Sequence, residues 1–163
     1  MRRPDIPVTS LSSADDCEQQ FYEALQSGDI DRVMSLWADD DEIACIHPGG
    51  QRLVGPQAIR ASFASFFRGG GMDIRADRVR RLQFAQTAVH HVVERVQAIG
   101  SDGPRFALVV VTNVYVQGAL GWRLAVHHAS PQSARGVVVE NSPVGRVSSD
   151  PDDADDDTPT TLH

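Results

Sequence analysis

Four long stretches of strand-forming residues occupy the second half of the chain and limit its fold more than any other feature. They span 72–86, 88–99, 105–117 and 120–129, and the glycine-bounded turns 100–103 and 118–121 separate the last three. Short turns of this kind join antiparallel strands. Strands of about 12 residues would each extend roughly 40 Å if flat. The resulting sheet is therefore expected to twist and curl.

The third of these stretches is apolar on both of its faces. One face presents Phe106, Leu108, Val110, Thr112, Val114 and Val116, and the other presents Ala107, Val109, Val111, Asn113 and Tyr115. A sheet that is apolar on both faces needs cover on both. Helices of one chain can cover only one face here. We therefore expect a homodimer formed through the outer face.

Three short amphipathic helices are predicted before the strands. Their expected starts are the serines at 12–13, Asp29 and Gly55-Pro56, because serine and aspartate cap helices and proline is tolerated in the first turn. The second helix is expected to run through Trp37 to the acidic residues 39–42, and a short strand is expected at 43–47. This order predicts an α+β domain, a cone-shaped, curved antiparallel sheet wrapped around three N-terminal helices.

Periodicity and composition divide the chain into three parts. Residues 1–11 read as a flexible arm, 12–130 as one folded domain, and 131–163 as an extension that ends in a disordered acidic tail. Six of the 22 acids lie in 150–157, so the rest of the chain has 16 acids and 15 bases. A nearly neutral body indicates neither nucleic-acid nor membrane binding.

Composition excludes several kinds of chemistry. All 15 bases are arginine, which rules out Schiff-base catalysis and a phosphate-loop lysine. The two cysteines, Cys17 and Cys45, cannot form a structural zinc site and are expected to be buried and reduced. No apolar run suits a membrane span or a secretory signal, so a cytoplasmic location is expected.

Three segments resemble the nuclear-transport-factor-2-like superfamily, in particular its SnoaL-like and kinase-association-domain-like branch. They are FYEALQSGDIDRVMSLWADD, CIHPGGQRLVGPQAIRASFASFF and WRLAVHHAS, and the resemblance covers about residues 14–130. It implies the same ketosteroid-isomerase-like or cystatin-like fold. The superfamily includes isomerases, dehydratases, cyclases and purely oligomerising domains, so the resemblance does not transfer an activity.

The resemblance also implies a set of pocket residues. Trp122 and His128 correspond to the terminal-strand tryptophan and histidine and are expected to share a face, since they lie six residues apart. Arg95 corresponds to an inner-face arginine of the kinase association domain, whereas Asn113 replaces a second one. His47 is expected at the mouth of the pocket.

These residues are expected to converge on one apolar cavity on the concave sheet face. The catalytic candidates are His128, His47 and Asp39, with an imidazole as the proton shuttle and Asp39 orienting it; the ligand-binding candidates are Trp37, Phe63, Phe67, Arg95, Asn113 and Trp122. Adjacent strand residues point to opposite faces, so neither histidine pair, 90–91 or 127–128, can chelate a metal from one side. His90 and His127 are expected to face the dimer side or solvent, and neither a metal nor a cofactor is expected.

The sequence leaves three functions open. The first is binding of a small apolar molecule that carries a carboxylate or carbonyl, which Arg95, Asn113 and His128 would recognise. The second is a cofactor-independent isomerase, dehydratase or cyclase that uses a pocket histidine. The third is an oligomerisation module without a ligand.

Overall fold

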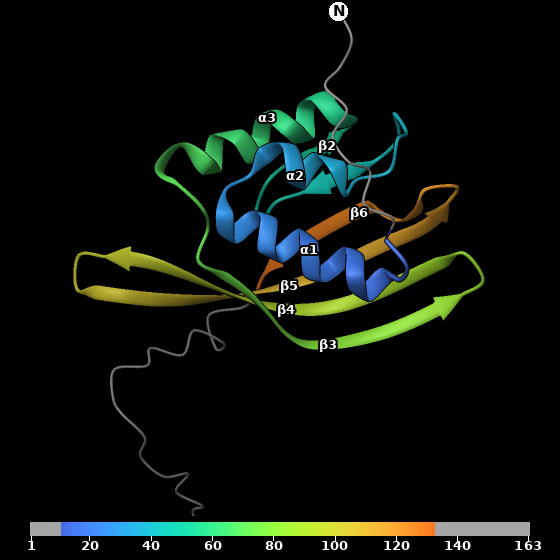
Figure 1. Cartoon of the computed structure of the whole chain (residues 1–163). Helices are drawn as coiled ribbons and strands as arrows, with labels where there is room; N and C mark the ends of the chain where they lie inside the picture. The colour runs from blue at the N-terminus through green and yellow to red at the C-terminus, as the bar shows by residue number, and fades with distance from the viewer. Residues whose placement is uncertain (1–10, 133–163) are drawn as a thin grey trace, which may run out of the picture.

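The computed structural model describes residues 11–132, except for the side chains of 98–100. Its elements are α1 (Ala14–Ser27), α2 (Ile30–Ser35), β1 (Ala44–Ile46), β2 (Arg52–Val54), α3 (Pro56–Phe66), a 3-10 turn (Phe67–Gly69), β3 (Ile74–Phe84), β4 (Thr87–Gly100), β5 (Gly103–Gly118) and β6 (Gly121–Pro131). The three helices lie on one face of a curved sheet, as Figure 1 shows. This confirms the predicted α+β layer. The predicted arm and acidic tail lie almost wholly outside the described residues.

Capping side chains explain where the helices begin and end. The Ser13 hydroxyl accepts a hydrogen bond from the Asp16 amide at 3.0 Å, and Gly28 ends α1 in the left-handed conformation at φ 69°. Asp29 caps α2 in the same way. The prediction that α2 continues through Trp37 is wrong: α2 ends at Ser35, and Trp37 forms an isolated parallel bridge with Leu124. No described helix is long and apolar enough to cross a membrane.

The sheet has six strands in the order β2-β1-β6-β5-β4-β3 and is not closed into a barrel. The four long strands and the short strand within 43–47 are confirmed, whereas β2 had not been predicted. One pairing also departs from the expected antiparallel pattern. β1 runs parallel to β6, with Cys45 opposite His127.

Aromatic packing joins the helices to the concave face. Phe21 of α1 is fully buried and makes edge-to-face contacts with Tyr22, Trp37 and Phe63, at ring-centroid distances of 5.5, 6.5 and 6.1 Å. Pairs of this kind contribute about 1 kcal/mol each beyond their buried area. These contacts lie between the helices and the concave face, where the apolar pocket had been expected.

A β-bulge in β6 changes which of two adjacent histidines faces the helices. Val114 pairs with Val126 and Tyr115 with Leu124, so Ala125 is the extra residue. Because a bulge shifts the alternation by one residue, His127 lies on the concave face with Trp122, and His128 is exposed on the other. The expectation that Trp122 and His128 share a face is therefore wrong.

The outer face of the sheet has no helix over it (Figure 1). One row of cross-strand neighbours on this face is wholly apolar and consists of Leu82, Val89, Val114 and Val126. Leu82 is 55% exposed, and Val110, on the same face, is 44% exposed. The described residues thus cover one face of the sheet and leave an apolar surface on the other.

Candidate functional site

The concave face holds buried polar side chains among its apolar ones. Those buried are Glu18, His90, Glu94, Asn113 and His127, from α1, β4, β5 and β6. The prediction that His90 and His127 face the dimer side or solvent is wrong, since they are only 2% and 4% exposed. Buried groups of this kind are usually hydrogen-bonded, and these form two clusters.

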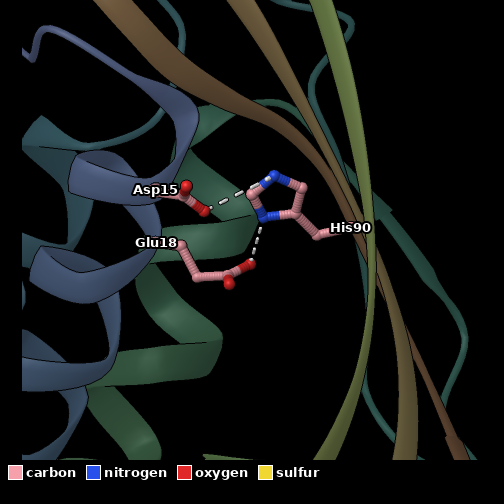
Figure 2. A group of neighbouring side chains, drawn as sticks. All are labelled: Asp15, Glu18 and His90. Atoms are coloured by element: carbon pink, nitrogen blue, oxygen red, sulfur yellow. Dashed lines mark hydrogen bonds and ion pairs between the residues drawn. The ribbon is translucent and has the colours of Figure 1, made fainter. Parts of the chain in front are cut away.

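The first cluster connects the start of α1 to β4 and β5. His90 Nδ1 lies 2.8 Å from Glu18 Oε2, and the Tyr115 hydroxyl donates to the same oxygen at 2.9 Å. The other ring nitrogen, His90 Nε2, lies 4.0 Å from Asp15 Oδ1. Figure 2 shows both carboxylates on the α1 side of the imidazole, each joined to a different ring nitrogen. Asp15 in turn accepts a hydrogen bond from Arg81 Nε at 2.5 Å.

The second cluster lies one helical turn further along α1. The Tyr22 hydroxyl donates to Glu94 Oε1 at 2.8 Å and accepts from Asn113 Nδ2 at 3.4 Å. Asn113 Oδ1 lies 2.7 Å from His127 Nδ1. An amide oxygen can only accept, so Nδ1 of His127 is the donor. Four side chains from α1, β4, β5 and β6 are therefore connected in one chain of hydrogen bonds.

Burial sets the protonation of the second cluster. It raises the pKa of Glu94 to about 7, although the hydrogen bond from Tyr22 opposes the rise. It lowers the pKa of His127 to about 3, so this imidazole is neutral at physiological pH. Burial also raises the pKa of Tyr22 well above its usual value, with the nearby Glu94 carboxylate adding to the effect. Glu94 is thus a carboxyl group that can gain or lose a proton near neutrality.

A groove between α1 and β3 reaches the edge of both clusters. Its volume is about 390 Å³, and it is lined by Asp15, Glu18, Gln19, Tyr22, Glu23, Gln26, Arg75, Ala76, Val79 and Arg81. Glu18 and Tyr22 are each 5% exposed and connect the groove to the buried clusters. Residues Asp77–Arg80 of β3 form a β-bulge in which Arg78 has a φ of 43°. Bulges and such strained residues are enriched beside functional sites.

The predicted catalytic residues do not converge on this groove. His47 is half-buried between Phe63 and Phe66, and its Nε2 lies 2.9 Å from the Ser62 hydroxyl. Burial lowers the pKa of His47. Asp39 is exposed, and His128 lies on the outer face. The structure therefore does not bring His47, His128 and Asp39 into one site.

The predicted ligand-binding residues are divided between core and surface. Trp37, Phe63 and Trp122 are buried in the core, and Phe67 packs against it. Asn113 belongs to the second cluster, as its predicted inward orientation requires. Arg95 follows the inward-facing Glu94 and lies on the outer face, 4.0 Å above the Phe106 ring. The indole nitrogen of Trp37 is, among the described residues, a buried donor without a hydrogen bond.

Sequence reasoning missed Glu18, Tyr22, His90 and Glu94 as site residues, although the sequence contains a signal for each. Glu18 and Tyr22 lie four residues apart and therefore on one side of α1. His90 and Glu94 alternate with the buried Ala88 and Val92 of β4. Polar residues at positions where the periodicity predicts a buried face are therefore the sequence pattern that indicates this site.

Similar proteins have the same architecture. An association domain assigned to calcium/calmodulin-dependent protein kinase type II in Thiobacillus denitrificans is 34% identical, with 76% of this chain and 98% of that chain covered and a TM-score of 0.68. A protein assigned as a dehydratase of the NTF2-like family in Streptomyces avermitilis is 28% identical over 72% of this chain and 93% of that one, with a TM-score of 0.65. The CaMKII hub of S. rosetta, 23% identical over 80% of this chain and all of that one, has a TM-score of 0.60 and shows the fold alone. No curated protein matches the chain in sequence.

A curved sheet with helices on its concave face and polar side chains between the two layers defines the class of NTF2-like α+β domains. Within that class, the SnoaL-like domain model matches residues 15–134. The chain belongs to the SnoaL-like domain family. The predicted resemblance is thereby confirmed.

Proposed function

We propose that the chain binds a small organic molecule in the groove between α1 and β3. The observation that supports this most directly is the floor of the groove, where the buried Glu18 and Tyr22 connect to both polar clusters. The groove volume of about 390 Å³ lies in the usual range of ligand sites. The ligand thus lies beside the helix, rather than in an apolar cavity deep on the concave face.

The groove favours a ligand with a carboxylate or carbonyl group at one end. Arg75 lines it and makes no ion pair with any of residues 11–132. An arginine can hold a carboxylate through two parallel hydrogen bonds. The side chains of Ala76 and Val79 supply apolar contact beside it. This retains the ligand class expected from the sequence and moves its recognition from Arg95 to Arg75.

A thermal-shift and calorimetric screen of small carboxylic acids and ketones tests this proposal. Wild type is expected to gain thermal stability with at least one compound, and Arg75→Ala and Tyr22→Phe are expected to weaken binding at least tenfold. Arg80→Ala is the matched control, because Arg80 lies on the same strand and does not line the groove. No stabilisation at millimolar concentrations, or an equal loss in Arg80→Ala, contradicts the proposal.

The titration of Glu94 favours an acid–base enzyme as the second candidate. Its carboxyl group, with a pKa of about 7, accepts a hydrogen bond from the groove-lining Tyr22. A group that titrates near the working pH suits proton transfer in an isomerase, dehydratase or cyclase, and one similar protein is assigned as a dehydratase. For any substrate found in the screen, the rate should depend on a group with a pKa near 7. Glu94→Gln should abolish turnover and leave binding intact.

The outer face favours self-association as a further candidate. It presents the apolar row Leu82, Val89, Val114 and Val126 without cover from the described residues. Two of the similar structures are, by name, association or hub domains. A homodimer through this face would bury the row. Light scattering of the purified chain at micromolar concentration tests it, and a strictly monomeric mass contradicts it.

A further inference from the structure

We propose that His90 and Asp15 bind a divalent transition-metal ion such as Zn²⁺ at the mouth of the groove, and that Glu18 orients the His90 imidazole for this purpose. Asp15, Glu18 and His90 each offer a ligand atom, and these atoms lie within 4.8 Å of one another. The site does not require the organic ligand proposed above. Its test therefore fails or succeeds independently.

The hydrogen bonding of His90 leaves one ring nitrogen available. An ionised carboxylate only accepts hydrogen bonds, so Nδ1 of the imidazole donates its proton to Glu18 Oε2 at 2.8 Å. The lone pair of the neutral ring then resides on Nε2. That nitrogen makes no hydrogen bond to any of the described residues, although the side chain is only 3% exposed. Asp15 Oδ1 lies 4.0 Å from it, which is too far for a hydrogen bond.

Two atoms with lone pairs thus lie 4.0 Å apart, a separation that one metal ion can bridge once the Asp15 side chain has turned toward Nε2. Zinc bonds to histidine nitrogen and carboxylate oxygen are about 2.0–2.2 Å long, so two of them span close to the observed 4.0 Å. The Asp15 side chain is 58% exposed and can rotate to bring the angle at the metal toward the tetrahedral value. Asp15 also lines the groove, so the remaining coordination positions are open to water or to a ligand there.

Glu18 stands where metal sites place an orienting carboxylate. Histidine ligands usually donate their second ring N–H to such a group, and that group is itself hydrogen-bonded. Here the Tyr115 hydroxyl donates a hydrogen bond to Glu18 Oε2 at 2.9 Å. Glu18 already accepts the Nδ1 proton, and Asp15 is the carboxylate joined to Nε2 in Figure 2, so an ion on Nε2 is expected to touch Asp15 and not Glu18. Glu18 is therefore a positioning residue in this proposal.

Charged residues around Asp15 affect metal binding in two opposite ways. Asp15, Asp16 and Glu18 bring three carboxylates into the first turns of α1. Against them, Arg81 already holds Asp15 at 2.5 Å and must release it when the metal binds. Removal of Arg81 should therefore strengthen metal binding. A mixed imidazole and carboxylate set favours Zn²⁺, Co²⁺ or Mn²⁺ over Ca²⁺.

Calorimetric titration of the full chain with Zn²⁺, repeated with Co²⁺ and its visible spectrum, tests the site. One ion per chain is expected. His90→Gln should abolish binding, and Asp15→Asn and Glu18→Gln should each weaken it at least tenfold, whereas Arg81→Ala should strengthen it several-fold. Asp16→Asn and His91→Gln are the matched controls, because they are the neighbours of Asp15 and His90 and lack their contacts to this site. Each variant is checked for folding by circular dichroism without metal.

Three results would overturn the proposal. The first is the absence of saturable binding at millimolar metal. The second is binding that Asp15→Asn and Glu18→Gln, both folded, leave unchanged, which would assign the ion to other acidic residues. The third is an equal loss in His91→Gln, which would assign it to exposed surface imidazoles.

Discussion

The two faces of the sheet are built from alternate residues of the same strands, yet they differ in kind. On β5, Val111, Asn113 and Tyr115 point to the helices and are fully buried. Their neighbours Val110, Thr112 and Val114 point away from the helices and are partly or largely exposed. The buried face therefore contains the polar hydrogen-bonded clusters, and the open face contains an apolar row.

This distribution is the reverse of what burial alone favours, and the reversal is informative. Buried polar groups stabilise a fold only weakly, because they lose their hydration. An exposed apolar row gains no stability from its contact with water. The two roles proposed above account for both features. In that proposal, the inner face supplies the floor of the groove, and the outer face offers a surface to a second copy of the chain.

The largest effect is expected from a matched pair of aspartate substitutions. Val111→Asp places a charge on the closed inner face and should destabilise the domain by about 4 kcal/mol or more, because Val111 is fully buried and the new carboxylate would lose its hydration. Val110→Asp, one residue away and 44% exposed, should change the free energy of unfolding of the single, unassociated chain by less than about 0.5 kcal/mol. Urea denaturation measures both. Similar losses of stability in the two variants would contradict the difference between the inner and outer faces of the sheet.

A pH-dependent effect is expected from Glu94→Gln. The pKa of Glu94 rises from 4.5 to about 7 on folding, so the folded state holds a proton that the unfolded state releases. Stability from this group is complete below pH 4.5 and is lost as the pH rises through 7, by about 3 kcal/mol in total. The glutamine variant should therefore exceed wild type in stability at pH 8 and match it near pH 4.5. Urea denaturation at both pH values measures the difference, and a difference that does not change with pH would contradict a buried, protonated Glu94.

A smaller effect is expected from the adjacent histidines of β6. His127→Ala removes the donor to Asn113 and leaves a cavity beside Phe21, so it should destabilise the domain by about 2 kcal/mol. His128→Ala should change stability by less than about 0.5 kcal/mol, since its side chain is exposed. Thermal unfolding compares the two. A larger loss of stability in His128→Ala than in His127→Ala would mean that His128, and not His127, is the buried histidine.

Local sequence signals predicted the fold well. The caps at Ser13 and Asp29, the proline at 56 and the alternation in 105–117 depend on neighbouring residues only, and the structure confirms each of them. The parallel pairing of β1 with β6 joins segments about 80 residues apart. Nothing local in the sequence encodes it.

The site was predicted poorly for two physical reasons. Alternation along β6 assigned His128 to the inner face, and the extra residue Ala125 reversed that assignment. A bulge inserts one residue without a strong composition signal. His90 was expected to face the dimer side or solvent, and Glu18 and Glu94 were not recognised as site residues, because charged residues seldom lie in a core unpaired. Their partners come from other elements, and only the three-dimensional arrangement supplies them.

Carboxyl-carbon NMR titration of Glu94, assigned by comparison with Glu94→Gln, tests most directly whether the inner face is a closed polar layer. If Glu94 is buried against Tyr22 as described, its resonance will titrate with a midpoint near pH 7. A midpoint near the usual glutamate value of about 4.3 would mean that water reaches this carboxyl group freely. The contrast between the two faces would then be wrong.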